Sequence, residues 1–337
     1  MKKYRWSGLF LCWLLAACLQ RPQRPVAFYY WKTQFSLNGY EREILQENKA
    51  QTLYVRYFDV DFKPEEDQPV PVSPVQLDTT IHHFRVIPVI FIKNRTFERL
   101  QAADIPDLAQ KVATLIAGIN KSQHVLTHEV QFDCDWTETT RANYFQFIQQ
   151  YRNLTHQPLS ATIRLHQVKY KERTGIPPVD RGVLMYYNMG AINGDNNNSI
   201  YERSIANRYN ACIKSYPLFL DVALPVFSWA LQIRNGKVVA LLNKITLTQF
   251  GYDSNFVITG SGRYLAKNAC FKNGYYFQQD DEIKPERVSA DDLLEITNQI
   301  NQYTNRRIGK IIFYDLDSTN LVHYEKDIFK KVSNNLN

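Results

Sequence analysis

The chain has 337 residues, of which 45% are hydrophobic and 22% charged, so its composition is that of a globular protein with one large domain or two ordinary ones. Lys2, Lys3 and Arg5 supply three of the seven excess positive charges. The remaining excess is small and no cluster of lysine and arginine follows, which excludes a surface that tracks a nucleic-acid backbone. The 21 tyrosines and 19 phenylalanines suit either large half-buried surfaces or platforms on which sugar rings stack.

The first residues have the layout of an export signal, with three basic residues before an apolar run from Gly8 to Leu15 that is too short to span a bilayer comfortably. Leu15-Ala16-Ala17-Cys18 resembles the bacterial lipobox, in which the cysteine is lipidated and becomes the first residue of the mature protein. The resemblance implies a lipoprotein signal peptide at 1–17 and a tether at 18–25. The lipid on Cys18 would anchor the protein to a membrane of the bacterial cell envelope, in the outer membrane or on the periplasmic face. An ordinary secretory signal cleaved near Ala17 is the alternative.

Short apolar segments recur along the chain, each followed by a loop and mostly by helix-like sequence. They predict eight strands, at residues 26–31, 52–60, 86–92, 129–135, 159–166, 182–187, 219–227 and 309–315. Amphipathic periodicity predicts helices at residues 40–49, 105–119, 138–152, 204–214 and 290–303. Residues 63–74 are rich in proline and acids, so we expect a long loop there. Residues 229–286 have the pattern of a β-rich insertion, in which Asn235-Gly236 predicts a hairpin.

Eight strands that alternate with helices favour a (β/α)8 TIM barrel over an open doubly wound sheet. Residues 26–330 would form this single domain, with the insertion between strands 7 and 8. No glycine-rich phosphate turn follows an early strand and no cysteine pair has metal-ligand spacing, so we expect no cofactor and no metal. Export permits a disulfide, and Cys212 with Cys270 is the plausible pair because both lie in loop-like sequence; the odd number of cysteines and their wide spacing leave open whether it forms.

Barrels carry function at the carboxyl ends of their strands, and polar and aromatic residues gather there in this sequence. The candidates for binding a substrate are Tyr30 and Trp31 (strand 1), Asp59 and Asp61 (strand 2), Arg164 and His166 (strand 5), Asn188 (strand 6), Trp229 (after strand 7) and Asp315 (strand 8). Acidic and aromatic groups in one mouth are suited to recognising a carbohydrate, which is the partner we expect. His82 and His83 precede strand 3, at the wrong end of the barrel for catalysis, and are expected to be structural.

Strand 4 belongs to the stretch EVQFDCDWTE at residues 129–138. Its alternation predicts an apolar face toward the helices, formed by Val130, Phe132, Cys134 and Trp136, and a face toward the barrel interior, formed by Gln131, Asp133 and Asp135. Arg164 and His166 share a face by the same rule and are the expected partners of the two aspartates. Two hypotheses remain open for these carboxylates: they line a functional pocket, or they form a structural salt bridge with Arg164.

DxDW at the end of a strand, in a barrel whose sixth strand reads MYYNMG, resembles the family 18 glycoside hydrolases, the chitinase-like barrels. Their fourth strand ends in DGxDxDWE, where the glutamate is the general acid and the aspartates orient the acetamido group of the substrate. The resemblance implies that Asp133 and Asp135 match the second and third aspartates. It also implies that Tyr187 matches the tyrosine of M-x-Y-D that positions the acetamido group. Trp229 resembles the tryptophan that floors the sugar site, although in the family that residue usually follows strand 8.

The sequence departs from the family motif at two positions. Val130 replaces the first aspartate, and Thr137 stands where the catalytic glutamate belongs. Threonine cannot protonate a glycosidic oxygen at neutral pH. Glu138 lies one residue later, where a strand turns the side chain to the other face unless a bulge re-aims it. The candidate catalytic residues are therefore Asp135 or Glu138 as the acid, with Asp133 and Tyr187 beside them.

A strand of the form DxDxxxxxRxxY that runs into a helix also marks a family of bacterial lipoproteins with a glycoside hydrolase-like barrel of uncharacterised activity. Asp133, Asp135, Arg141 and Tyr144 stand at those positions. Two functions therefore remain open. One is an envelope-anchored glycosidase or transglycosidase in which the acetamido group of the substrate acts as nucleophile. The other is a catalytically inactive barrel that binds a glycan or serves as an envelope scaffold.

Overall fold

The computed structural model describes residues 24–63, 65–243, 248–260, 262–304 and 308–336, so the expected signal peptide and Cys18 lie outside the described residues. Parallel strands close into a barrel, because β1 pairs with both β3 and β18. The barrel strands are β1 (Val26–Tyr30), β3 (Thr52–Lys63), β6 (Arg85–Ile92), β7 (Val130–Asp133), β8 (Leu159–Arg164), β9 (Arg181–Met185), β10 (Leu220–Pro225) and β18 (Ile308–Tyr314). The predicted (β/α)8 barrel is confirmed.

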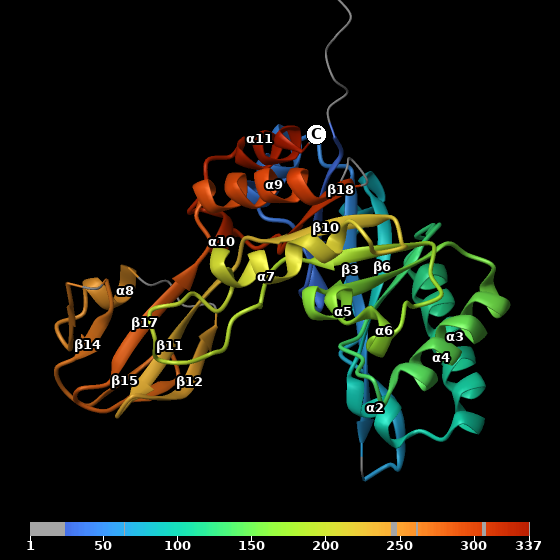
Figure 1. Cartoon of the computed structure of the whole chain (residues 1–337), viewed down its shortest axis with the longest axis horizontal. Helices are drawn as coiled ribbons and strands as arrows, with labels where there is room; N and C mark the ends of the chain where they lie inside the picture. Colours follow the sequence, from blue (N-terminus) through green and yellow to red (C-terminus); the bar gives the residue numbers. More distant parts are fainter. Residues whose placement is uncertain (1–23, 64, 244–247, 261, 305–307, 337) are drawn as a thin grey trace, which may run out of the picture.

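Helices pack around the barrel, and all five of the predicted ones are present (Figure 1). They are α1 (Gly39–Glu47), α3 (Ile105–Ser122), α4 (Arg141–Thr155), α7 (Arg203–Ile213) and α9 (Ala290–Thr304). The sequence did not predict α2 (Asn94–Arg99), α5 (Leu165–Lys169), α6 (Lys171–Thr174), α10 (Ser318–Leu321) and α11 (Ile328–Asn335). Helix α4 begins later than predicted because the Thr140 hydroxyl accepts the backbone N–H of Thr137 at 2.9 Å, which closes a turn before the helix.

The side chains of β7 and the residues after it alternate as the sequence predicts. Phe132 points outward and packs edge-on against Tyr151 of α4, with ring centroids 4.9 Å apart. Trp136 is buried on the same side. On the opposite face Gln131 lies inside the barrel, where its Oε1 accepts the hydroxyl of Tyr29 at 2.7 Å. The helices therefore cover the apolar face, and the polar face is left for the interior.

Residues 63–74 do not form the predicted long loop. They contain strand β4 (Gln68–Val72), which pairs antiparallel with the end of β3. Pro69 and Pro71 are compatible with this strand because β4 is an edge strand, where the missing N–H faces away from the ladder. A bulge in β3, between Arg56 and Phe58, shifts the alternation of the residues that follow it.

The insertion between β10 and β18 forms its own antiparallel sheet, in the order β12-β11-β17-β14-β13. Its elements are β11 (Ser228–Arg234), β12 (Lys237–Asn243), α8 (Thr248–Gly251), β13 (Phe256–Ile258), β14 (Tyr264–Ala266), β17 (Glu282–Arg287) and the hairpin of β15 (Cys270–Lys272) with β16 (Tyr275–Phe277). Asn235 and Gly236 both adopt positive φ, 49° and 74°, in the turn between β11 and β12, which confirms the predicted hairpin. The insertion projects to one side of the barrel (Figure 1).

The structure answers the open question of a disulfide between Cys212 and Cys270: Cys134, Cys212 and Cys270 are all free. Cys212 lies on α7 and packs against the barrel core, whereas Cys270 lies in β15 and packs against the separate core of the insertion. The two cysteines therefore belong to different cores. None of the helices among the described residues is long and apolar enough to cross a membrane.

A buried carboxylate closes the amino-terminal end of the barrel. Asp221 of β10 is fully buried and accepts the guanidinium of Arg181 and the backbone N–H of Lys310, each at 3.0 Å. Strand β18 carries an extra residue at this point relative to β10, and Gly309 passes close to Asp221. A Cβ atom at Gly309 would lie 2.2 Å from Oδ1 of Asp221, so only glycine fits here without a shift of neighbouring atoms.

Candidate functional site

Aromatic rings form a continuous band across the carboxyl ends of the barrel strands. The ring centroids of Trp31 and Tyr314 are 5.3 Å apart, and the ring of Tyr314 stacks on that of Tyr187 with a centroid distance of 5.6 Å. Phe227 then contacts Tyr187 at 5.7 Å and Trp229, at the start of β11, at 5.2 Å. We call these five residues the aromatic band. Its middle is buried, whereas Trp31, Tyr314 and Trp229 are only partly buried, so rings are accessible at both ends.

The sequence predicted three members of the aromatic band, Trp31, Tyr187 and Trp229, and missed Phe227 and Tyr314. Phe227 is the last residue of a predicted strand and Tyr314 the last but one, so their location at the carboxyl ends of strands could have indicated them. Tyr30 does not belong to the band, contrary to the prediction. Because Tyr29 faces the interior, Tyr30 points outward, where it is buried and its hydroxyl donates to the carbonyl of Gln34 at 2.8 Å.

Asp133 lies inside the mouth and is only 7% exposed. Its Oδ1 accepts the hydroxyl of Thr162, on the neighbouring strand β8, at 2.7 Å. Burial, and then the charge of Asp135 nearby, raises the pKa of the Asp133 carboxyl to about 6. The site therefore contains a carboxylic acid that keeps its proton in mildly acidic solution.

Asp135 forms a two-point ion pair with Arg164, whose Nε and a terminal nitrogen lie 2.5 and 2.7 Å from the carboxylate oxygens. The pair is at the surface of the mouth, since the Asp135 side chain is 49% exposed and that of Arg164 22%. His166 does not share the strand face of Arg164, contrary to the prediction. Strand β8 ends at Arg164, and His166 is exposed on α5, where the strand alternation no longer applies.

Neither residue after Trp136 brings a carboxyl to the interior. The hydroxyl of Thr137 bonds with those of Thr139 and Thr140, at 2.9 and 3.2 Å. Glu138 is exposed and forms an ion pair with Arg173 of α6 at 2.9 Å. The position of the family's catalytic glutamate therefore holds only a hydroxyl.

The acidic residues at the end of β3 are both in ion pairs. Oδ1 of Asp59 lies 2.7 Å from Nε of Arg56. The bulge in β3 lies between these two residues and brings their side chains to the same face of the strand. Asp61 accepts two bonds from Arg95 and one from Lys93, at 2.5 to 2.6 Å. The hydrogen bond from Arg95 leads the interactions that lower the pKa of Asp61 to about 2, against a smaller opposing effect of burial. Asp61 is therefore charged at neutral pH and acts as an acceptor.

The two remaining candidates, Asp315 and Asn188, each directly follow a tyrosine of the aromatic band in the sequence. Asp315, after β18, is buried and accepts a long hydrogen bond, 3.4 Å, from the side-chain amide of Asn320. Asn188 is exposed and has a positive φ of 52°, and its backbone N–H donates to the carbonyl of Ile200 at 2.8 Å. His82 and His83 lie in a 3-10 helix, Thr79–His83, that precedes β6. Within the described ranges no group of three or more histidine, cysteine, aspartate or glutamate side chains is placed to hold a metal.

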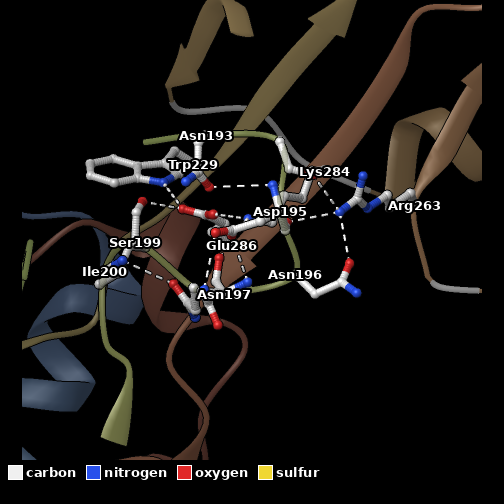
Figure 2. Close-up of polar contacts among 12 residues, drawn as sticks. Asn193, Asp195, Asn196, Asn197, Ser199, Ile200, Trp229, Arg263, Lys284 and Glu286 are labelled. Atoms are coloured by element: carbon white, nitrogen blue, oxygen red, sulfur yellow. Dashed lines mark hydrogen bonds and ion pairs between the residues drawn. The ribbon is translucent and has the colours of Figure 1, made fainter. Parts of the chain in front are cut away.

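A second polar cluster lies where the loop after β9 meets the insertion (Figure 2). Glu286 of β17 is at its centre and contacts Trp229 of the aromatic band, Ser199 of the loop and Lys284. Of this cluster the sequence predicted Trp229 alone as a candidate. Ser199 and Glu286 were missed because they are 87 positions apart in the sequence and meet only through the folded insertion.

Comparisons with known proteins identify the fold. No protein-family model matches the sequence, and no curated protein sequence matches it. Among solved structures, the spore cortex-lytic enzyme SleL of Bacillus cereus matches with a TM-score of 0.57 at 11% identity, over 93% of this chain and 74% of that one. A family 18 chitinase from Cycas revoluta matches with a TM-score of 0.56 at 12% identity, over 92% and 98% of the two chains. The chain thus has the barrel fold of these glycoside hydrolases.

Proposed function

We propose that the barrel mouth binds a glycan and does not hydrolyse it. The aromatic band carries this proposal, because Trp31, Tyr314 and Trp229 are partly exposed and charged groups lie near the band. Asp133 and Arg164 interact electrostatically with Tyr187 and Tyr314, and Glu286 accepts the indole N–H of Trp229. Ring faces combined with a few placed polar groups are what recognition of a pyranose chain requires. The Cycas revoluta chitinase was solved in complex with (GlcNAc)4, which supports an oligosaccharide of N-acetylglucosamine as the class of ligand.

The carboxylates support the second half of the proposal. Hydrolysis of a glycoside needs one carboxyl that protonates the leaving oxygen and a second group that attacks the sugar or activates water. Thr137 replaces the acid, Asp135 is neutralised by Arg164, and Glu138 is paired outside the interior. Of the two acids that the sequence suggested, Asp135 is in an ion pair and Glu138 points away from the barrel interior, so neither is placed to protonate a glycosidic oxygen.

A glycosidase is the second candidate, because one carboxyl has the protonation state that a general acid needs. Asp133 keeps its proton up to about pH 6, since burial raises its pKa. In this hypothesis Asp133 protonates the glycosidic oxygen and the acetamido group of the substrate supplies the nucleophile. The two candidates differ in one observable, the release of reducing ends.

We expect (GlcNAc)4 to bind to the full chain without cleavage, and Trp31→Ala to weaken binding about tenfold or more, because it removes an aromatic anchor worth about 1.4 kcal/mol or more. Isothermal titration calorimetry measures the affinity, and a reducing-end assay measures turnover. Tyr252→Ala is the matched control, since this tyrosine of the insertion is 92% exposed and lies outside the aromatic band. A glycan array run on the same protein identifies a better ligand of this class.

Three results would contradict the first candidate. Reducing ends that the wild type releases and Asp133→Asn does not would establish the glycosidase instead. Equal affinities of the wild type and Trp31→Ala would remove the aromatic band from the site. If the array shows no glycan bound at all, both candidates are wrong.

We further propose that the chain is a lipoprotein anchored to the cell envelope through Cys18. Leu15-Ala16-Ala17-Cys18 supports this, because the cysteine stands where the lipobox requires it. We expect Cys18→Ala to abolish labelling by a radioactive fatty acid and to shift the protein out of the membrane fraction, because acyl chains supply the binding energy to the bilayer. Cys12→Ala is the control, and it should leave both readouts unchanged. Membrane retention of unlabelled Cys18→Ala would contradict the lipid anchor.

A further inference from the structure

A buried carboxylate stands at the joint between the insertion and the barrel. Glu286 of β17 is only 2% exposed. Its Oε2 accepts the indole N–H of Trp229 at 2.8 Å and the hydroxyl of Ser199. Its Oε1 lies 2.7 Å from the ammonium of Lys284, which is also buried. Oε1 makes no hydrogen bond with the described residues, so the charge of Lys284 and the two hydrogen bonds to Oε2 are what offset the cost of burying this carboxylate.

The three partners of Glu286 come from three parts of the chain. Trp229 is its cross-strand neighbour, because the two residues face each other in the β11–β17 pair. Lys284 lies two residues earlier on β17 and so points to the same side of the sheet. Ser199 comes from the loop that follows β9. Glu286 therefore connects both strands that lead into and out of the insertion with a loop of the barrel mouth (Figure 2).

Two cations hold this loop on the sheet of the insertion. The Lys284 ammonium donates to the carbonyl of Asn197 at 2.6 Å. The Arg263 guanidinium donates to the carbonyls of Gly194 and Asp195, at 3.0 and 2.9 Å. Three backbone carbonyls of the loop thus accept hydrogen bonds from side chains of the insertion. The loop is fixed along its length, and not at Ser199 alone.

The same loop reaches the buried part of the aromatic band. The backbone N–H of Asn188 donates to the carbonyl of Ile200, next to Ser199, at 2.8 Å. Asn188 directly follows Tyr187, which contacts Phe227. Tyr187 and Trp229, on either side of Phe227, are therefore both connected to Glu286, Trp229 directly and Tyr187 through the loop.

We propose that Glu286 is the positioning residue of the glycan site: it fixes the indole ring of Trp229, so that the insertion contributes a rigid stacking surface to the mouth. This inference rests on the proposed function. The indole N–H points at the carboxylate while the ring extends away from the polar cluster (Figure 2). A ring that is already held in place loses little conformational freedom when a sugar stacks on it, which favours binding.

The test uses three variants of the full chain, and a fourth, Trp229→Phe, to assign the spectrum. Glu286→Ala removes the acceptor of the indole N–H, whereas Glu286→Gln retains an acceptor oxygen and loses the charge. Asp281→Ala is the matched control, because Asp281 is an equally buried carboxylate of the insertion that bonds with Arg234 and Gln232 and not with Trp229. The indole N–H signal of Trp229 in a nitrogen–proton correlation spectrum, assigned with Trp229→Phe, reports the ring directly. Calorimetry with (GlcNAc)4 reports the affinity.

We expect Glu286→Ala to shift the indole N–H signal of Trp229. The affinity for (GlcNAc)4 should fall about tenfold, as the loss of one hydrogen bond to a charged group predicts. Glu286→Gln should retain an indole signal and an affinity close to those of the wild type, because an acceptor oxygen remains. Asp281→Ala should change neither the indole signal nor the affinity. If Glu286→Ala does not fold, Glu286→Asp replaces it, because the shorter side chain keeps the charge for Lys284 and draws the acceptor away from the indole N–H of Trp229, and it should show the same two changes. An unmoved indole signal, or affinities equal to that of Asp281→Ala, would overturn the inference. If the wild type binds no glycan, the proposed function is wrong, and the indole signal by itself still decides whether Glu286 holds Trp229.

Discussion

Replacement of Asp133 by asparagine is expected to raise the free energy of unfolding at pH 7 by roughly 2–3 kcal/mol. Burial raises the pKa of this carboxyl from 3.8 to about 6, with a further contribution from Asp135. At neutral pH the native protein must therefore hold a buried charge that the unfolded chain holds in water. Asparagine carries no charge and can still accept the hydroxyl of Thr162.

The same shift sets the direction of the pH dependence. Below about pH 4 the Asp133 carboxyl is protonated in both states and adds no penalty. Between 3.8 and about 6 the unfolded chain releases a proton that the folded protein keeps, so the stability of the wild type should fall as pH rises through this range and then level off. Urea unfolding of both proteins at pH 4, 5, 6 and 7 measures the difference.

A control with the opposite sign is available in the insertion. Although burial acts in the other direction, the hydrogen bond from Arg234 lowers the pKa of Asp281. Asp281→Asn should therefore destabilise the protein at pH 7. If Asp133→Asn leaves stability unchanged across the range, the carboxyl is not desolvated and the second candidate function loses its acid.

The second large effect is expected from Gly309→Ala, which should lower the free energy of unfolding by about 3 kcal/mol or more. The new methyl carbon would lie 2.2 Å from Oδ1 of Asp221 and 2.6 Å from the ring of Phe219. Relief of these contacts must move Asp221, which is fully buried and holds Arg181. Guanidinium unfolding followed by circular dichroism measures the loss.

Gly118→Ala is the matched control for this substitution. Gly118 is exposed in α3, and a Cβ there meets nothing within 4 Å. Alanine is the better helix former, so this variant should gain about 0.5–1 kcal/mol. A Gly309→Ala variant as stable as the wild type would mean that the amino-terminal end of the barrel adjusts freely around Asp221.

The barrel could be predicted because parallel strands buried on both sides are nearly continuous apolar runs, as at residues 86–92 and 219–227. Strand β4 could not, because Pro69 and Pro71 argue against a strand until its place at the edge of the sheet is known. The bulge in β3 was equally hidden, since a bulge is defined by the register with a partner strand and the sequence does not show that register.

The candidate site was predictable where strand alternation holds and unpredictable where it ends. The alternation of side chains along a strand predicted that Asp133 faces the interior. The same alternation makes Tyr30 point outward, because its neighbour Tyr29 faces inward. His166 was misplaced because the chain leaves strand geometry after Arg164. Ser199 and Glu286 are 87 positions apart in the sequence, and only the folded insertion brings them together.

The prolines of β4 have a further consequence for a protein that we propose to be anchored to a membrane. An exposed strand edge offers N–H and C=O groups with which a neighbouring molecule can continue the sheet, and aggregation starts from such edges. Pro69 and Pro71 have no N–H to offer on the open side of β4. The hairpin of β3 and β4 thus extends the barrel beyond its rim while resisting strand-by-strand association between copies.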